Sequence, residues 1–160
     1  MKPILINNLE FAKKQEEIMH EIDVDSCERL FDLLEKNSTL SKSIRYTLIG
    51  SASTFHLPSL DLKVEAKLPV LCQRCLQPML LNLSLSFEYV VADVEPAAFE
   101  GEDDIDWVAA SREMNVNHLV EDELLIAIPI GPLHSHTCKP PIQEAAQKPN
   151  PFAVLKDLLK

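Results

Sequence analysis

Basic residues and glycine are scarce in this sequence. Lys and Arg number 15 against 25 Asp and Glu among 160 residues, a formal net charge of −10. Electrostatic binding to nucleic-acid phosphates requires clustered Lys and Arg, so the negative net charge argues against a protein that binds nucleic acid over its whole surface. No stretch interleaves aromatic and basic residues as an RNA-binding sheet does. The same charge favours basic protein partners.

Several common catalytic and phosphate-binding sequence motifs are absent. With only 3 glycines, the chain has neither G-x-x-x-x-G-K-[ST] nor G-x-G-x-x-G, and it also lacks H-E-x-x-H and G-x-S-x-G. Cys138 lies close to His134 and His136, but the sequence places no carboxylate to orient a cysteine–histidine pair. We therefore expect a protein that is not an enzyme.

Long apolar runs are absent too. None approaches the length of a bilayer span, and the opening MKPILINNLEF is too short in apolar residues for a secretory signal. We expect a cytoplasmic protein without a membrane partner. In that reducing compartment, a C-x-x-C pair binds metal or cycles as a thiol pair more often than it forms a structural disulfide.

Alternation of apolar and polar residues is the clearest structural signal. It runs through 44–48, 60–70 and 79–91, and such long period-two patterns predict antiparallel strands with one buried face. Apolar residues at helical spacing predict helices over 27–34 and 119–127. The expected fold is α+β: an antiparallel, curled or barrel-like sheet covered by two or three helices.

The chain has no boundary that would separate two large domains. We expect a single domain over residues 1–138, followed at 139–160 by a proline-bounded linker and a short amphipathic helix. Asn150 and Pro151 suit the start of that helix, and Phe152 begins its apolar stripe. A helix this short is marginal alone, so it must dock on its own domain or on a partner.

Cys72 and Cys75 form a C-x-x-C pair between the two longest predicted strands. The pair is therefore expected as a knuckle at the tip of a hairpin. Three interpretations stay open: a metal site, a redox-active pair, or small apolar residues that pack. Redox pairs usually precede a helix, whereas this pair lies between strands.

The second half of a metal site lies in HSHTC, at residues 134–138. If that stretch is extended, His134, His136 and Cys138 share one face, because side chains two apart point the same way. Together with Cys72 and Cys75 they offer five candidates for a four-ligand Cys3His zinc site. The fold must then bring the two halves together across the 62 positions from Cys72 to His134.

An acidic stretch follows the last long strand. Eight acids and no Lys or Arg lie between Glu88 and Asp106, with Glu102, Asp103 and Asp104 at its centre. Such a stretch is a solvated loop or a surface for a basic partner. A carboxylate cluster for Mg²⁺ is a third interpretation, which is disfavoured because acids adjacent in sequence rarely converge on one ion. Arg74 is the one basic residue inside the knuckle, and it would serve a direct contact with RNA.

Three segments taken together resemble the YceD family, the bacterial large ribosomal RNA subunit accumulation proteins. They are CQRCLQP at 72–78, LVEDELLIAIPIGPLHSHTC at 119–138 and QKPNPFAVLKDLL at 147–159. The resemblance implies a cytoplasmic, non-enzymatic factor that supports synthesis, processing or stability of large-subunit (23S) rRNA. His134 follows a Pro-Leu step as in the family pattern, which favours it over His136 as a ligand.

Three functional hypotheses follow. In the first, the acidic surface engages a basic ribosomal protein or assembly factor on the large ribosomal subunit precursor, and Zn²⁺ holds the knuckle rigid. In the second, Arg74 and nearby Lys residues contact rRNA directly. In the third, the C-x-x-C pair is a thiol redox or stress-sensing switch.

Overall fold

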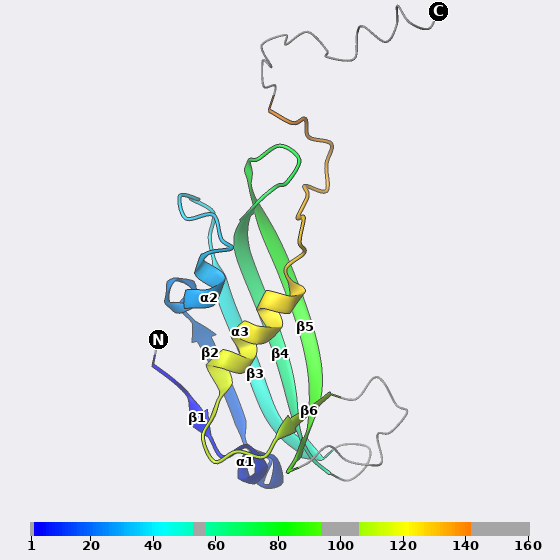
Figure 1. Ribbon diagram of the computed structural model, residues 1–160. Helices are drawn as coiled ribbons and strands as arrows, with labels where there is room; N and C mark the ends of the chain where they lie inside the picture. The colour runs from blue at the N-terminus through cyan, green and yellow to red at the C-terminus, as the bar shows by residue number, and fades with distance from the viewer. Residues whose placement is uncertain (1, 53–56, 94–105, 142–160) are drawn as a thin grey trace, which may run out of the picture.

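The computed structural model describes residues 2–52, 57–93 and 106–141, and Figure 1 shows their arrangement. The chain forms seven strands, three α-helices and one short 3-10 helix in these ranges. In chain order the elements are β1 (Leu5–Ile6), α1 (Asn8–Lys14), β2 (Glu17–Ile22), η1 (Val24–Ser26), α2 (Glu28–Phe31), β3 (Ser43–Ala52), β4 (Pro58–Leu71), β5 (Pro78–Ala92), β6 (Asp106–Ala109), β7 (Met114–Asn115) and α3 (Val116–Ala127).

The α+β class predicted from the sequence is confirmed. The main sheet has the order β2-β3-β4-β5-β6, and its first four strands are antiparallel neighbours, while β6 runs parallel to β5. The barrel-like alternative is wrong: the sheet is open, with β2 at one edge and β6 at the other in the part of the chain that the structure describes. It stays open because β6 spans only four residues beside β5 and does not meet β2.

The buried face of the sheet is the alternating apolar row that the sequence predicts. Residues of β3 and β4 on this face are 0–2% exposed, namely Ile44, Tyr46, Leu48, Leu60, Leu62, Val64, Ala66, Leu68 and Val70. α3 crosses this face (Figure 1) and buries Val116, Val120 and Leu124 completely. Burial of apolar side chains on both layers stabilises the domain, at about 1.5–3 kcal/mol for each large side chain.

Two of the predicted helices differ in length from the expectation. The helix predicted over 27–34 is only Glu28–Phe31, although Cys27, Leu30 and Leu34 are buried as its spacing implied. α3 begins three residues before the predicted 119 because the Asn115 side chain accepts a hydrogen bond from the Asn117 amide and caps the helix there.

Polar contacts fix α3 on the rest of the domain. The Glu121 carboxylate is 5% exposed and accepts hydrogen bonds from the backbone amides of Arg29 and Leu30, at 3.1 and 3.3 Å, and from the Arg29 guanidinium. On the sheet side, the Tyr46 hydroxyl donates to Asn117 at 3.1 Å. Because both contacts are buried or half-buried, they fix the N-terminal half of α3 against α2 and the sheet.

The segment after α3, residues 128–141, runs beside the upper end of β5 toward the connection between β4 and β5 (Figure 1). Residues 142–160 lie outside the described residues, and so does most of the predicted linker and C-terminal helix. Among the described residues, no helix is both long and apolar enough to cross a lipid bilayer.

Candidate metal centre

Cys72 and Cys75 lie in the connection between β4 and β5, whose antiparallel register ends with Leu71 opposite Pro78. The Leu76 amide donates to the Cys72 carbonyl at 2.8 Å, and the Cys72 amide donates to the Gln77 carbonyl at 3.0 Å. Leu76 takes a positive φ of 58°, which non-glycine residues rarely adopt. The resulting tight turn places both cysteine side chains inward, at 0% and 7% exposure.

The segment after α3 brings the other two candidates to this turn. The Gln73 amide donates to the carbonyl of the buried Pro132 at 2.9 Å, which attaches the segment just before His134. Arg74 then donates to the His136 carbonyl at 3.5 Å. These contacts join residues about sixty positions apart and place His134 and Cys138 over the turn.

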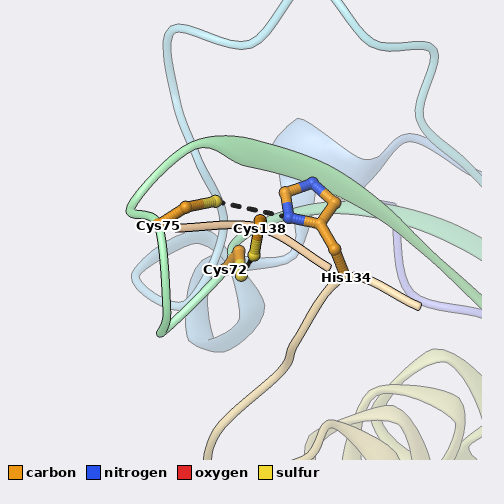
Figure 2. A group of neighbouring side chains, drawn as sticks. All are labelled: Cys72, Cys75, His134 and Cys138. Carbon is orange, nitrogen blue, oxygen red and sulfur yellow. Dashed lines mark hydrogen bonds between the residues drawn. The ribbon is translucent and has the colours of Figure 1, made fainter. Parts of the chain in front are cut away.

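Four side chains converge as a result (Figure 2): Cys72, Cys75, His134 and Cys138, whose sulfur and nitrogen atoms all lie within 4.8 Å of one another. Cys72 Sγ is 3.7 Å from Cys138 Sγ, and Cys75 Sγ is 3.4 Å from His134 Nδ1. A tetrahedral zinc ion with its usual bond lengths holds two sulfurs about 3.8 Å apart and a sulfur and a nitrogen about 3.5 Å apart. The spacing of the side chains fits such an ion.

His136 is excluded from this group by its position. Its ring centroid lies 4.6 Å from that of His134, but its side chain is exposed and is not among the converging atoms. An extended strand would place residues 134 and 136 on one face, as we expected. The stretch bends instead at 135 and 136, so that His134 and Cys138 meet the cysteines and His136 does not.

The sequence comparisons agree with the segments that build this cluster. The family model described as "Large ribosomal RNA subunit accumulation protein YceD" matches residues 60–159. The chain belongs to the YceD family. A relative in Haemophilus influenzae, named large ribosomal RNA subunit accumulation protein YceD, is 34% identical over 113 residues, which cover 60% of this chain. The chain spans 62% of that relative's length, and no solved structure matches the chain.

All four converging residues lie inside the region that the YceD family model matches.

The electrostatics at Cys72 favour an anionic ligand. Burial opposes ionisation of the thiol, but hydrogen bonds from the backbone amides of Cys75, His134 and Arg74 outweigh it and lower the pKa of Cys72 to about 5. A thiolate is the form of cysteine that binds metal, and amide donors at a tight turn stabilise it.

Cys138 and Cys27 differ from Cys72, because their pKa values are raised. Burial and the neighbouring Cys75 and Cys72 sulfurs raise the pKa of Cys138, because the site concentrates negative charge when no cation is present. Burial, with Glu121 and Asp23 nearby, raises the pKa of Cys27 to about 11. Cys27 is 1% exposed in the core, as its helical spacing predicted, so it is a packing residue.

The predicted partner-binding residues are only partly described. Arg74 is half-exposed beside the cluster, where it contacts the His136 carbonyl. Glu102, Asp103, Asp104 and Phe152 lie outside the described residues. Sequence reasoning missed the roles of Gln73 and Leu76, because a backbone hydrogen bond and a positive φ leave no signature in a Gln or a Leu.

Proposed function

We propose that this protein is a cytoplasmic, non-enzymatic factor that supports the accumulation of large-subunit rRNA, and that a Cys3His zinc site stabilises the part of it that meets its partner. The family match over residues 60–159 carries the proposal, because the matched region holds the whole four-residue cluster. The relative's name supplies the link with the large ribosomal RNA.

The metal would be held by Cys72, Cys75, His134 and Cys138. These four residues complete a tetrahedral shell, and a zinc site with four protein ligands leaves no position for water or substrate. The metal would therefore supply structure and not catalysis: it would fix the β4–β5 connection, as a zinc knuckle, to the segment that follows α3.

A basic ribosomal protein or assembly factor on the large-subunit precursor is the partner class that the charge supports. The net charge of −10 attracts basic surfaces, and the acidic stretch centred on Glu102, Asp103 and Asp104 would be the contact, with Phe152 as an apolar anchor. Arg74 stands beside the zinc cluster and would contribute a contact to rRNA or to an acidic group of the partner.

The function is tested by deletion and complementation in the organism from which the gene comes. We expect the deletion strain to lose large-subunit rRNA relative to small-subunit rRNA, and the wild-type gene and His136→Ala to restore it. Cys138→Ser should restore it incompletely. Tagged protein should recover large-subunit precursors or assembly factors. Normal large-subunit rRNA in the deletion strain, with nothing ribosomal recovered, would contradict the proposal.

A direct RNA contact is tested separately with the purified protein. Affinity for rRNA should fall steeply with salt and should be lost in Arg74→Glu if Arg74 binds phosphate. Lys13→Glu is a matched control, because Lys13 is exposed on α1, away from the cluster. Equal affinity of the two variants would show that Arg74 does not contact the RNA, and no measurable affinity of the wild type at low salt would eliminate a direct RNA contact.

A thiol redox switch is the second candidate, and one distance favours it. Cys72 Sγ and Cys138 Sγ are 3.7 Å apart, and Cys72 has a lowered pKa. A peroxide could take two electrons from these two thiols to leave a disulfide and water. Thiol labelling separates the candidates: metal-bound thiolates resist mild labelling until a chelator is added, whereas a free pair labels at once and loses reactivity only after oxidation.

A further inference from the structure

The outer edge of β5 is a long stretch of sheet edge. β5 pairs with β4 from Val90 back to Pro78, but on its other side β6 pairs only with Tyr89–Ala92. Figure 1 shows β6 beside the lower end of β5 and the segment after α3 beside its upper end. That segment bonds to Gln73 through the Pro132 carbonyl. Within the described ranges, no strand pairs with the outer edge between Pro78 and Glu88.

This edge lacks the features by which proteins usually prevent edge-to-edge pairing. Residues 78–87 contain no Asp, Glu, Lys or Arg, and Pro78 stands only at the end. The register with β4 runs without a bulge from Val90 to Pro78. Charges, interior prolines and bulges are the common protective devices. The opposite edge of the sheet carries charges, since Glu17 and Glu21 lie within the six residues of β2.

We propose that the outer edge of β5 pairs antiparallel with β5 of a second copy of this chain, over residues 80–88 and centred on Ser84. The two sheets would then continue into one another across a two-fold axis. The inference stands apart from the proposed function and from the metal site, because it rests on the edge alone.

The side chains of this edge are self-complementary in that register. Ser84 lies opposite Ser84 of the second copy, and Asn82 lies opposite Ser86; all three residues are exposed in the single chain. At the two ends of the register Leu80 lies opposite Glu88. On the other face, Leu83 lies opposite Leu85 and Leu81 opposite Phe87. The apolar row is only partly buried in the single chain, so pairing covers the remainder. Matched cross-strand pairs of this kind stabilise an antiparallel ladder.

Although the net charge of the whole chain attracts basic partners, the side chains along this edge give a basic peptide strand no advantage over a second copy. A basic strand would find no carboxylate to pair with along residues 78–87. Two copies each carry a net charge of −10, but antiparallel pairing sends their acidic ends in opposite directions. The two Glu88 residues would stand about 27 Å apart, at roughly 3.4 Å per residue, well beyond a Debye length of about 8 Å.

Charge substitutions at the two-fold axis test the proposal by sedimentation or light scattering of the full chain. We expect Ser84→Lys and Ser84→Glu each to raise the dimer dissociation constant about tenfold or more, because each places two like charges side by side. An equimolar mixture of the two variants should restore the dimer. Thr39→Lys, in an exposed loop away from β5, should dimerise like the wild type.

Hydrogen exchange gives a second measurement that does not depend on a variant. Alternate backbone amides in residues 80–88 should gain protection as the protein concentration rises. A wild-type chain that stays monomeric from micromolar to millimolar concentration would overturn the proposal, whether its edge amides are exposed or are covered by its own chain. A dimer that both Ser84 variants leave intact would overturn it as well.

Discussion

Zinc should raise the thermal stability of this protein by an amount that follows from how far apart in the chain its ligands lie. Cys75 and His134 are 59 positions apart, and Cys72 and Cys138 are 66 apart. Joining residues across such a span removes about 4 kcal/mol of chain entropy from the unfolded state, by the relation used for disulfides. Free zinc at a thousandfold excess over its dissociation constant gives a similar figure of about 4 kcal/mol.

For a domain of this size, about 4 kcal/mol corresponds to a rise in Tm of about 8–16 °C. We expect calorimetry to show that rise when chelator-treated protein takes up one equivalent of zinc. Cys138→Ser should show little of it. A Cys27→Ala variant should have a lower starting Tm, because it opens the core, but should keep the whole rise with zinc.

Cys138→Ser and Cys27→Ala test whether the rise in Tm comes from zinc at the four-residue cluster. If stoichiometric zinc raises Tm by less than about 2 °C, the four side chains do not constrain the unfolded chain in the way that their separation implies. If Cys138→Ser gains as much as the wild type, the metal binds elsewhere. Elemental analysis of the same samples shows whether the ion is present in each case.

Three further predictions follow from named contacts. His134→Ala should abolish stoichiometric zinc binding, whereas His136→Ala should retain it, as measured by elemental analysis, because only His134 faces the cysteines. Glu121→Ala should cost about 2–3 kcal/mol in denaturant unfolding, because it removes the acceptor of the buried Leu30 amide and of the part-buried Arg29 amide, while the half-exposed Arg29 guanidinium stays hydrated. Asp122→Ala, whose contact with Arg29 is exposed, should cost under about 1 kcal/mol. Burial raises the pKa of Tyr46 to about 12, so between pH 10 and pH 12 the folded state keeps a proton that the unfolded chain has lost. The contribution of Tyr46 to stability should therefore be constant below pH 10 and fall by about 3 kcal/mol as the pH rises through 12. Tyr46→Phe should flatten that decline. An alkaline unfolding profile that is unchanged in Tyr46→Phe would show that the hydroxyl does not control it.

The strands could be predicted from the sequence because each element carries its own signal. Residues 60–70 and 79–91 alternate without interruption, and two such strands with a short connection pair as antiparallel neighbours, so the connection that contains Cys72 and Cys75 follows from the pattern alone. The α2 region was predicted too long, because its apolar spacing continues to Leu34 although the helix ends at Phe31. There the spacing predicted the burial of Cys27, Leu30 and Leu34 correctly, but it was wrong about the length of the helix and about Phe31, which is exposed.

The choice between His134 and His136 shows the limit of local reasoning about the site. Both histidines fit the spacing of a ligand, and an extended strand would have aligned them with Cys138. The bend after His134 lies between two hydrogen bonds to the β4–β5 turn, one from Gln73 to Pro132 and one from Arg74 to His136, which join distant parts of the chain. Periodicity carries no information about such a contact, and only the family pattern favoured His134.

Local residue order was enough to predict the strands, the acidic character of the chain and the residue types able to bind zinc, because hydrophobic periodicity, charge and ligand chemistry are properties of the residues themselves. Three features depend on tertiary structure: the sheet stays open, His134 and Cys138 reach the β4–β5 turn, and the outer edge of β5 between Pro78 and Glu88 has no partner strand in the described chain. The placement of His134 and Cys138 depends on contacts between residues far apart in the chain, such as Glu121 with Arg29, Tyr46 with Asn117 and Gln73 with Pro132, and such contacts leave no periodic signal in the local sequence.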